Sequence, residues 1–235
     1  MNATSVQSTL LARADLLLTL RDLCSMPADG GQALARVEAL AEGADELLHA
    51  AELATTHAAL LAEACILARD AGPAQRAIDI ATWDGAATGL DLHEAAYVRR
   101  DRGAILGDIA GFYQAFGVQP GSNDQRVDRL GTELEFMGLL YLLQVRAMGD
   151  DAAEQLGIVV AAQAAFWKDH LADWCTLPAA RAELLPAPAW LTRALLATAT
   201  CLADLAAAQG WPAPASDDRG EAELQTEPAC GMACG

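Results

Sequence analysis

Residues 104–117 read AILGDIAGFYQAFG, and residues 130–141 read LGTELEFMGLLY. In both stretches large apolar residues recur every three or four positions, which places them on one face of a helix. We expect Phe112 and Phe116 to face inward from the first helix, which should end at Gly117. The segment between the stretches, QPGSND at 119–124, has the composition of a turn. The sequence therefore predicts two amphipathic helices joined by a loop.

The rest of the chain also has the composition of a helical protein. Hydrophobic residues make up 53% of its 235 residues but aromatic residues only 5%, so alanine and leucine, which favour helices, supply most of the apolar content. Runs of β-branched residues with a period of two are missing. We predict an all-α, single-domain helical bundle over residues 1–212. Further helices are expected at about 5–24, 32–42, 44–71, 151–174 and 189–209.

The composition changes at Ala213. Residues 213–235 are rich in Pro, Ser, Asp, Glu and Gly and lack apolar anchors, which predicts a disordered acidic tail. The tail ends in a Cys-x-x-x-Cys formed by Cys230 and Cys234. These thiols could share a metal, form a disulfide or stay reduced, and two ligands alone do not make a structural zinc site.

The formal net charge of −17 constrains the partners. Such a surface repels phosphate backbones and favours a basic partner, so we expect no binding to nucleic acid. The N-terminal stretch lacks the basic region of a secretory signal, and no uninterrupted apolar run reaches the length of a membrane span. We therefore expect a cytoplasmic protein.

The string Asp128-x-Leu-x-x-Glu-Leu-Glu-Phe-Met, preceded by AGFYQAFG at 110–117, resembles the TorD/DmsD/NarJ family of redox-enzyme maturation chaperones. It is most similar to the delta-subunit chaperones of the nitrate, chlorate, selenate, dimethylsulfide and ethylbenzene oxidoreductase group. The resemblance is dense from about Tyr97 to Trp174. The family usually has His after the Asp and often Pro two residues before it, whereas this chain has Arg129 and Arg126 there.

The resemblance implies a chaperone and not an enzyme, with no cofactor or metal of its own. Its partner would be the apo catalytic subunit of a molybdenum oxidoreductase, bound through a twin-arginine signal peptide and held until molybdopterin is inserted. Family members also form homodimers by swapping helices. The residues expected to contact the client are Tyr97, Asp128, Arg129, Glu133, Glu135 and Phe136. A groove with these carboxylates beside aromatic surface would suit a basic and apolar peptide.

Two other functions stay open at this stage. One is a helical enzyme that depends on a metal or a thiol, and the other is a structural subunit retained in the mature complex. The sequence argues against a di-iron enzyme, because a di-iron helical bundle needs two Glu-x-x-His motifs and the chain has one, Glu46-x-x-His49.

Overall fold

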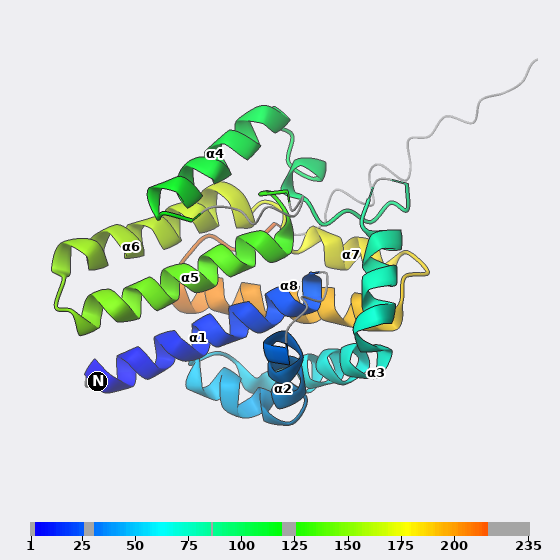
Figure 1. Cartoon of the computed structure of the whole chain (residues 1–235), viewed down its shortest axis with the longest axis horizontal. Helices are drawn as coiled ribbons and strands as arrows, with labels where there is room; N and C mark the ends of the chain where they lie inside the picture. The colour runs from blue at the N-terminus through cyan, green and yellow to red at the C-terminus, as the bar shows by residue number, and fades with distance from the viewer. Residues whose placement is uncertain (1–2, 26–30, 86, 119–125, 216–235) are drawn as a thin grey trace, which may run out of the picture.

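The computed structural model describes residues 3–25, 31–85, 87–118 and 126–215, and these residues contain helices and no strand (Figure 1). The all-α prediction is confirmed. The helices are α1 (Ala3–Cys24), α2 (Gly31–Ala50), η1 (Thr55–His57), α3 (Ala58–Trp83), η2 (Glu94–Ala96), α4 (Arg102–Ala115), α5 (Leu130–Gly149), α6 (Ala153–Phe166), the π-helical turn η3 (Trp167–Leu171), α7 (Leu177–Glu183) and α8 (Ala189–Gln209).

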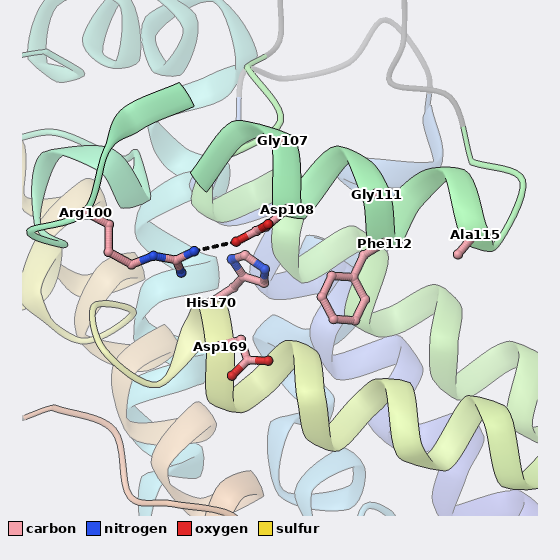
Figure 2. Close-up of a pocket in the computed structure, with 8 residues that line it drawn as sticks. All are labelled: Arg100, Gly107, Asp108, Gly111, Phe112, Ala115, Asp169 and His170. Carbon is pink, nitrogen blue, oxygen red and sulfur yellow. Dashed lines mark hydrogen bonds and ion pairs between the residues drawn. The ribbon is translucent and has the colours of Figure 1, made fainter. Parts of the chain in front are cut away.

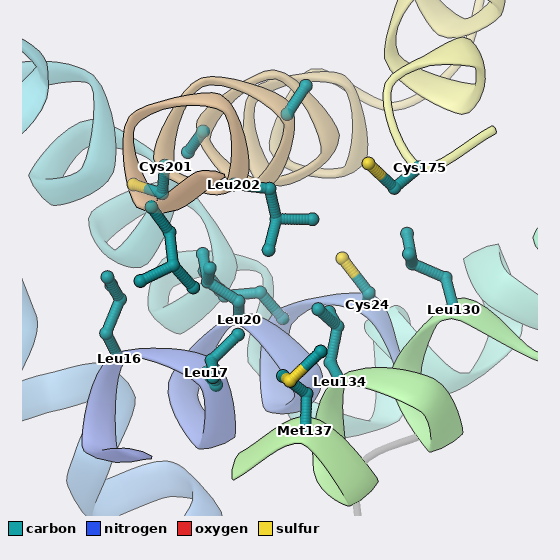
Figure 3. Packing of buried hydrophobic residues seen from close by; sticks show 14 of the residues in the cluster. Leu16, Leu17, Leu20, Cys24, Leu130, Leu134, Met137, Cys175, Cys201 and Leu202 are labelled. Carbon is teal, nitrogen blue, oxygen red and sulfur yellow. The ribbon is translucent and has the colours of Figure 1, made fainter. Parts of the chain in front are cut away.

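The core lies between α1, α5 and α8, and α1 and α5 run side by side (Figure 1). Leu17 and Leu20 of α1 meet Leu134 and Met137 of α5, with Leu202 of α8 closing the cluster (Figure 3). All five side chains are buried. Burying each one stabilises the fold by about 1.5–3 kcal/mol, so this layer holds the bundle together.

Two glycines let α5 approach α1 closely. A Cβ atom at Gly131 would lie 1.9 Å from Ser25 Oγ, and one at Gly138 would lie 3.3 Å from Leu18 Cγ. Any larger residue would push the two helices apart or force the facing side chains to move.

Helix α8 is long and apolar enough to cross a membrane by length and composition alone, but 56% of that window is buried inside the bundle. It packs against α1, α3 and α7, as the core helix of a globular domain does. Gly210 ends it in the left-handed conformation, with φ 67°.

The predicted helix at 44–71 is wrong at its start. Helix α2 continues through a kink at Gly43 to Ala50, and α3 begins only at Ala58. The break is fixed by the core, because Arg13 Nε donates to the Ala51 carbonyl at 2.9 Å. Helical geometry is lost at Gly72 as expected, but it resumes at Pro73, a residue that suits the first turn of a helix, and continues to Trp83.

The inward face of α4 is narrower than predicted. Ile105, Ile109 and Tyr113 are buried, whereas Phe112 and Phe116 are only half-buried. A spacing of four residues keeps the first three on one line, so the two phenylalanines lie at its edge. Helix α4 lies on the outer side of the bundle beside α6 (Figure 1), and its Phe112 and Phe116 side chains stay partly exposed.

Candidate functional site

The site expected from the sequence centres on the junction before α5. The connection after α3 runs beside it, since Glu94 N donates to Asp128 O at 2.8 Å and Leu130 N donates to Leu92 O at 2.8 Å. A single antiparallel bridge links His93 to Arg129. The backbone thus ties two segments that are more than thirty residues apart in the chain.

The Asp128 side chain is fully buried. Its two oxygens accept from Arg126 Nε at 3.0 Å and Nη2 at 2.6 Å, and Oδ2 also lies 3.4 Å from Ala95 N. Arg126, which occupies the usual proline position, therefore supplies from within the chain the guanidinium that we expected from a client. Bidentate pairs of this kind are the stronger ion pairs.

Arg129 pairs with neither Asp128 nor Glu133. Its Nη2 lies 2.8 Å from Asp84 Oδ2, at the end of α3. Asp84, Asp91 and His93 bring three potential metal-ligand atoms within 4.8 Å of one another. The Arg129 guanidinium already supplies a positive charge to this group, and Asp84 Oδ1 accepts from Leu92 N at 2.9 Å. We assign the group a structural role.

A buried acidic pair lies behind the junction. Glu133 and Glu94 have no exposed surface, and burial, followed by the charges of Glu94 and Asp128, raises the pKa of Glu133 well above its usual value. Trp174 Nε1 donates to Glu133 Oε2 at 3.3 Å, and His170 Nδ1 lies 3.0 Å from Glu94 Oε2. Adjacent buried carboxyls disfavour one another's ionisation, which is the second cause, after burial, of the raised pKa of Glu133.

Tyr97 is half-buried and stacks on Trp174, with ring centroids 5.9 Å apart. Its hydroxyl donates to Asp91 O at 2.8 Å, and burial raises its pKa to about 12. Glu135 points away from the junction and pairs with Arg21 of α1 at 2.5 Å, with 48% of its side chain exposed. These two are the predicted residues that reach the surface.

Phe136 lies in an aromatic cluster under α4 and is only 2% exposed. Its ring centroid is 4.7 Å from Tyr113 and 4.8 Å from Phe166. Tyr113 Oη donates to Val127 O at 3.0 Å, which ties the cluster to the junction.

The structure therefore brings Tyr97, Asp128, Arg129 and Glu133 together but does not arrange them as the open acidic groove that we expected. Helical spacing explains the difference, because positions 133 and 136 face inward while position 135 faces outward. Sequence reasoning missed Glu94 as a partner of Glu133 and left His170 as an isolated histidine, since only the fold joins residues 76 positions apart.

Comparison with known proteins agrees with this geometry. The model of a family described as "Nitrate reductase delta subunit" matches residues 87–179. Over this segment, which is less than half of the chain, the protein is similar to that family. The match spans η2, α4, α5, α6 and η3, and so includes the junction and the buried acidic pair. No curated protein and no solved structure matches the chain.

The four described cysteines, Cys24, Cys65, Cys175 and Cys201, are all free and buried. Burial raises the pKa of Cys24 to about 11 and those of Cys65 and Cys201 to about 12, and it raises the Cys175 pKa further. A nucleophilic or metal-binding cysteine must lose its proton near neutral pH, so these thiols are packing residues. Cys230 and Cys234 lie outside the described residues.

Two cavities open along α4. One cavity of about 760 Å³ lies between α4 and η3, and it is lined by Arg100, Gly107, Asp108, Gly111, Phe112, Ala115, Asp169 and His170 (Figure 2). A second cavity of about 500 Å³ lies between α4, α5 and α6 and has apolar lining from Phe116, Leu143, Ile158 and Val159. Ala115 lines both cavities.

Proposed function

We propose that this protein is a maturation chaperone for a molybdenum oxidoreductase. It binds the catalytic subunit through a twin-arginine signal peptide in the cytoplasm and holds it until molybdopterin has been inserted, before assembly and export. The observation that carries the proposal is the match to the nitrate reductase delta-subunit family over residues 87–179.

The junction supports this role as a scaffold. A binding protein needs rigid walls. The Arg129–Asp84 pair and the contact of Asp128 with Ala95 N fix the connection between α3 and α4 against the start of α5. The buried residues of the junction then act indirectly, because they hold in place the segments that contact the client. These residues are Asp128, Arg129, Glu133 and Phe136. Tyr97 and Glu135 have the exposed surface to contact it directly.

The charge of the molecule supports a basic ligand. Its net charge of −17 attracts the arginine pair of a signal peptide over a distance and raises the rate of encounter. Apolar surface along α4 then suits the hydrophobic stretch that follows the arginines in such peptides.

The test compares strains that express a molybdoenzyme catalytic subunit of the same genome with and without the gene for this protein. The molybdenum content of the exported enzyme should fall sharply when the gene is deleted and should recover when the gene is restored. The chaperone should co-purify with the precursor and be missing from the mature enzyme. Full molybdenum loading in the deletion strain would contradict the proposal. Presence in the purified, exported enzyme would instead indicate a structural subunit.

A further inference from the structure

Helix α4 carries an unusual row of small residues. Gly103, Gly107, Gly111 and Ala115 recur every four positions along its exposed side. A Cβ at Gly107 or Gly111 would meet no atom within 4 Å, so packing inside the chain does not require glycine there. Each glycine in a helix interior costs about 1 kcal/mol relative to alanine. The row is therefore explained by something that approaches the helix backbone from outside.

A second observation lies in the floor of the same cavity. His170 is only 1% exposed and lines the cavity with Gly107 and Gly111, and its ring lies under α4 beside Asp108 and Phe112 (Figure 2). Its Nδ1 faces Glu94, whereas its Nε2 has no hydrogen-bond partner among the described residues. The Glu94 carboxylate accepts from Nδ1, so Nε2 is a buried polar atom left without a partner in the part of the chain that the structure describes. A buried polar atom of this kind needs a hydrogen-bond partner.

The rim of the cavity carries two carboxylates, Asp108 and Asp169, together with the Arg100 guanidinium, and Asp169 lies 3.7 Å from Lys168 Nζ. Asp108 and Asp169 are about half exposed, at 55% and 50% of their side chains. Arg100 forms an ion pair with Asp108 in the free chaperone. It shows that this carboxylate receives a guanidinium, and an exposed pair of this kind contributes less than about 1 kcal/mol, so it exchanges easily.

The two cavities differ in chemistry from end to end. The cavity with His170 offers the carboxylates of Asp108 and Asp169 as acceptors for N–H groups, whereas the other offers the apolar side chains of Phe116, Leu143 and Ile158. Ala115 lines both cavities, and the distance along α4 from Gly107 to Ala115 is about 12 Å. The occupant is therefore a segment with guanidinium groups at one end and an apolar stretch at the other.

We propose that the groove along α4, formed by the two cavities, holds the client's signal segment with its arginines at Asp108, Asp169 and His170 and its apolar stretch against Phe116, Leu143 and Ile158. The glycine row allows the peptide backbone to lie close to the helix. This inference rests on the proposed function and places its ligand away from the buried junction.

The experiment uses the full chain and a synthetic peptide with two consecutive arginines followed by an apolar stretch of about ten residues. Gly111→Leu places a bulky side chain in the groove at a position where its Cβ meets no atom within 4 Å, and Gly157→Leu makes the same change on an exposed part of α6 that lines neither cavity. Calorimetry should show the Kd rising by at least about ten-fold for Gly111→Leu and staying within about two-fold for Gly157→Leu.

A second pair of measurements checks the charge and the location. The double change Asp108→Asn and Asp169→Asn should weaken the arginine peptide but leave a diglutamine version of it unchanged. Hydrogen exchange should slow in α4 and α6 of the wild-type chain on peptide addition, a readout that stands even if a variant fails to fold.

Equal affinities for the two leucine variants, with no protection in α4, would overturn the groove while leaving the proposed function intact. Failure of the wild-type chain to bind either the peptide or the complete precursor would overturn both.

Discussion

At the scale of single residues, the junction contains more ionisable groups than its sequence suggests. Four of them, Glu94, Asp128, Glu133 and His170, have at most 1% exposed surface. The Glu-Leu-Glu-Phe-Met run identifies Glu133 as important, but its burial and its proximity to Glu94 follow only from the fold. Sequence periodicity describes one helix at a time, so contacts between η2, α5 and η3 could not be predicted from it.

Glu133→Gln should change how stability depends on pH. The pKa of Glu133 is raised in the folded chain. Its protonated form therefore contributes fully to the free energy of unfolding below the ordinary pKa of 4.5, and this contribution is lost as pH rises through the folded pKa. The variant should lose less stability than wild type as pH rises above 4.5, and it should be at least as stable as wild type at the highest pH measured. Urea unfolding at several pH values measures this.

Glu135→Gln is the matched control, because Glu135 lies on the same helix but is exposed and paired with Arg21. Because this change leaves Glu94 and Glu133 in place, the stability of the Glu135→Gln variant should depend on pH as that of the wild type does. An unchanged pH profile in Glu133→Gln, together with lower stability, would mean that Glu133 is ionised in the folded chain.

Asp128→Ala should act mainly on stability, because the carboxylate is buried and holds both Arg126 and the backbone of η2. Arg126 remains 33% exposed, so water compensates it in part, and we expect a loss of about 1–3 kcal/mol in the free energy of unfolding. Thermal and urea unfolding check this. A variant as stable as wild type that nevertheless loses client affinity would make Asp128 a direct ligand contact.

At the scale of helices, most elements could be predicted from apolar spacing and from glycines at their ends, as for α8 and Gly210. The boundary between α2 and α3 could not, because Ala- and Leu-rich sequence continues through the break. The close contact of α1 with α5 also has no sequence pattern of its own: Gly131 and Gly138 look like Gly107 and Gly111 until the neighbouring helix is in place.

That contrast gives a matched pair of variants. Gly138→Val should destabilise the chain by about 1–3 kcal/mol, because its side chain would press on Leu18 and the Ala14 carbonyl. Gly111→Ala should raise stability by up to about 1 kcal/mol, since α4 is open there and alanine favours helix. Denaturant midpoints of the two proteins measure both effects. Equal midpoints would show that α1 and α5 do not pack as tightly as the structure has them.

At the scale of the whole molecule, the bundle extends slightly beyond the boundary at 212 that we predicted. Trp211 stacks on Trp167 at 5.7 Å, and Trp167 Nε1 donates to Pro212 O at 2.8 Å. Ala215 N then donates to Ala172 O at 2.7 Å. Residues 216–235, most of the predicted acidic tail, lie outside the described residues.

Two truncations test this boundary. A chain ending at Ala215 should unfold like the full-length protein, because the remaining tail lacks apolar anchors. A chain ending at Gly210 should lose about 2–4 kcal/mol, since the Trp167 stacking partner and hydrogen bond are removed. Circular dichroism and thermal melting compare them. A large loss in the longer truncated chain would show that the acidic tail is docked.

Recognition of a twin-arginine client by an acidic chaperone is tested most directly by association kinetics. The on-rate of the client precursor should fall as salt rises, because exposed charges are screened over about 8 Å at physiological ionic strength. Changing both arginines to glutamine should lower the on-rate and flatten its salt dependence, while the off-rate, set mainly by the apolar stretch, changes little. A salt-independent on-rate, with no loss of affinity for the glutamine precursor, would contradict the account and would indicate that the chaperone binds the folded body of the client instead.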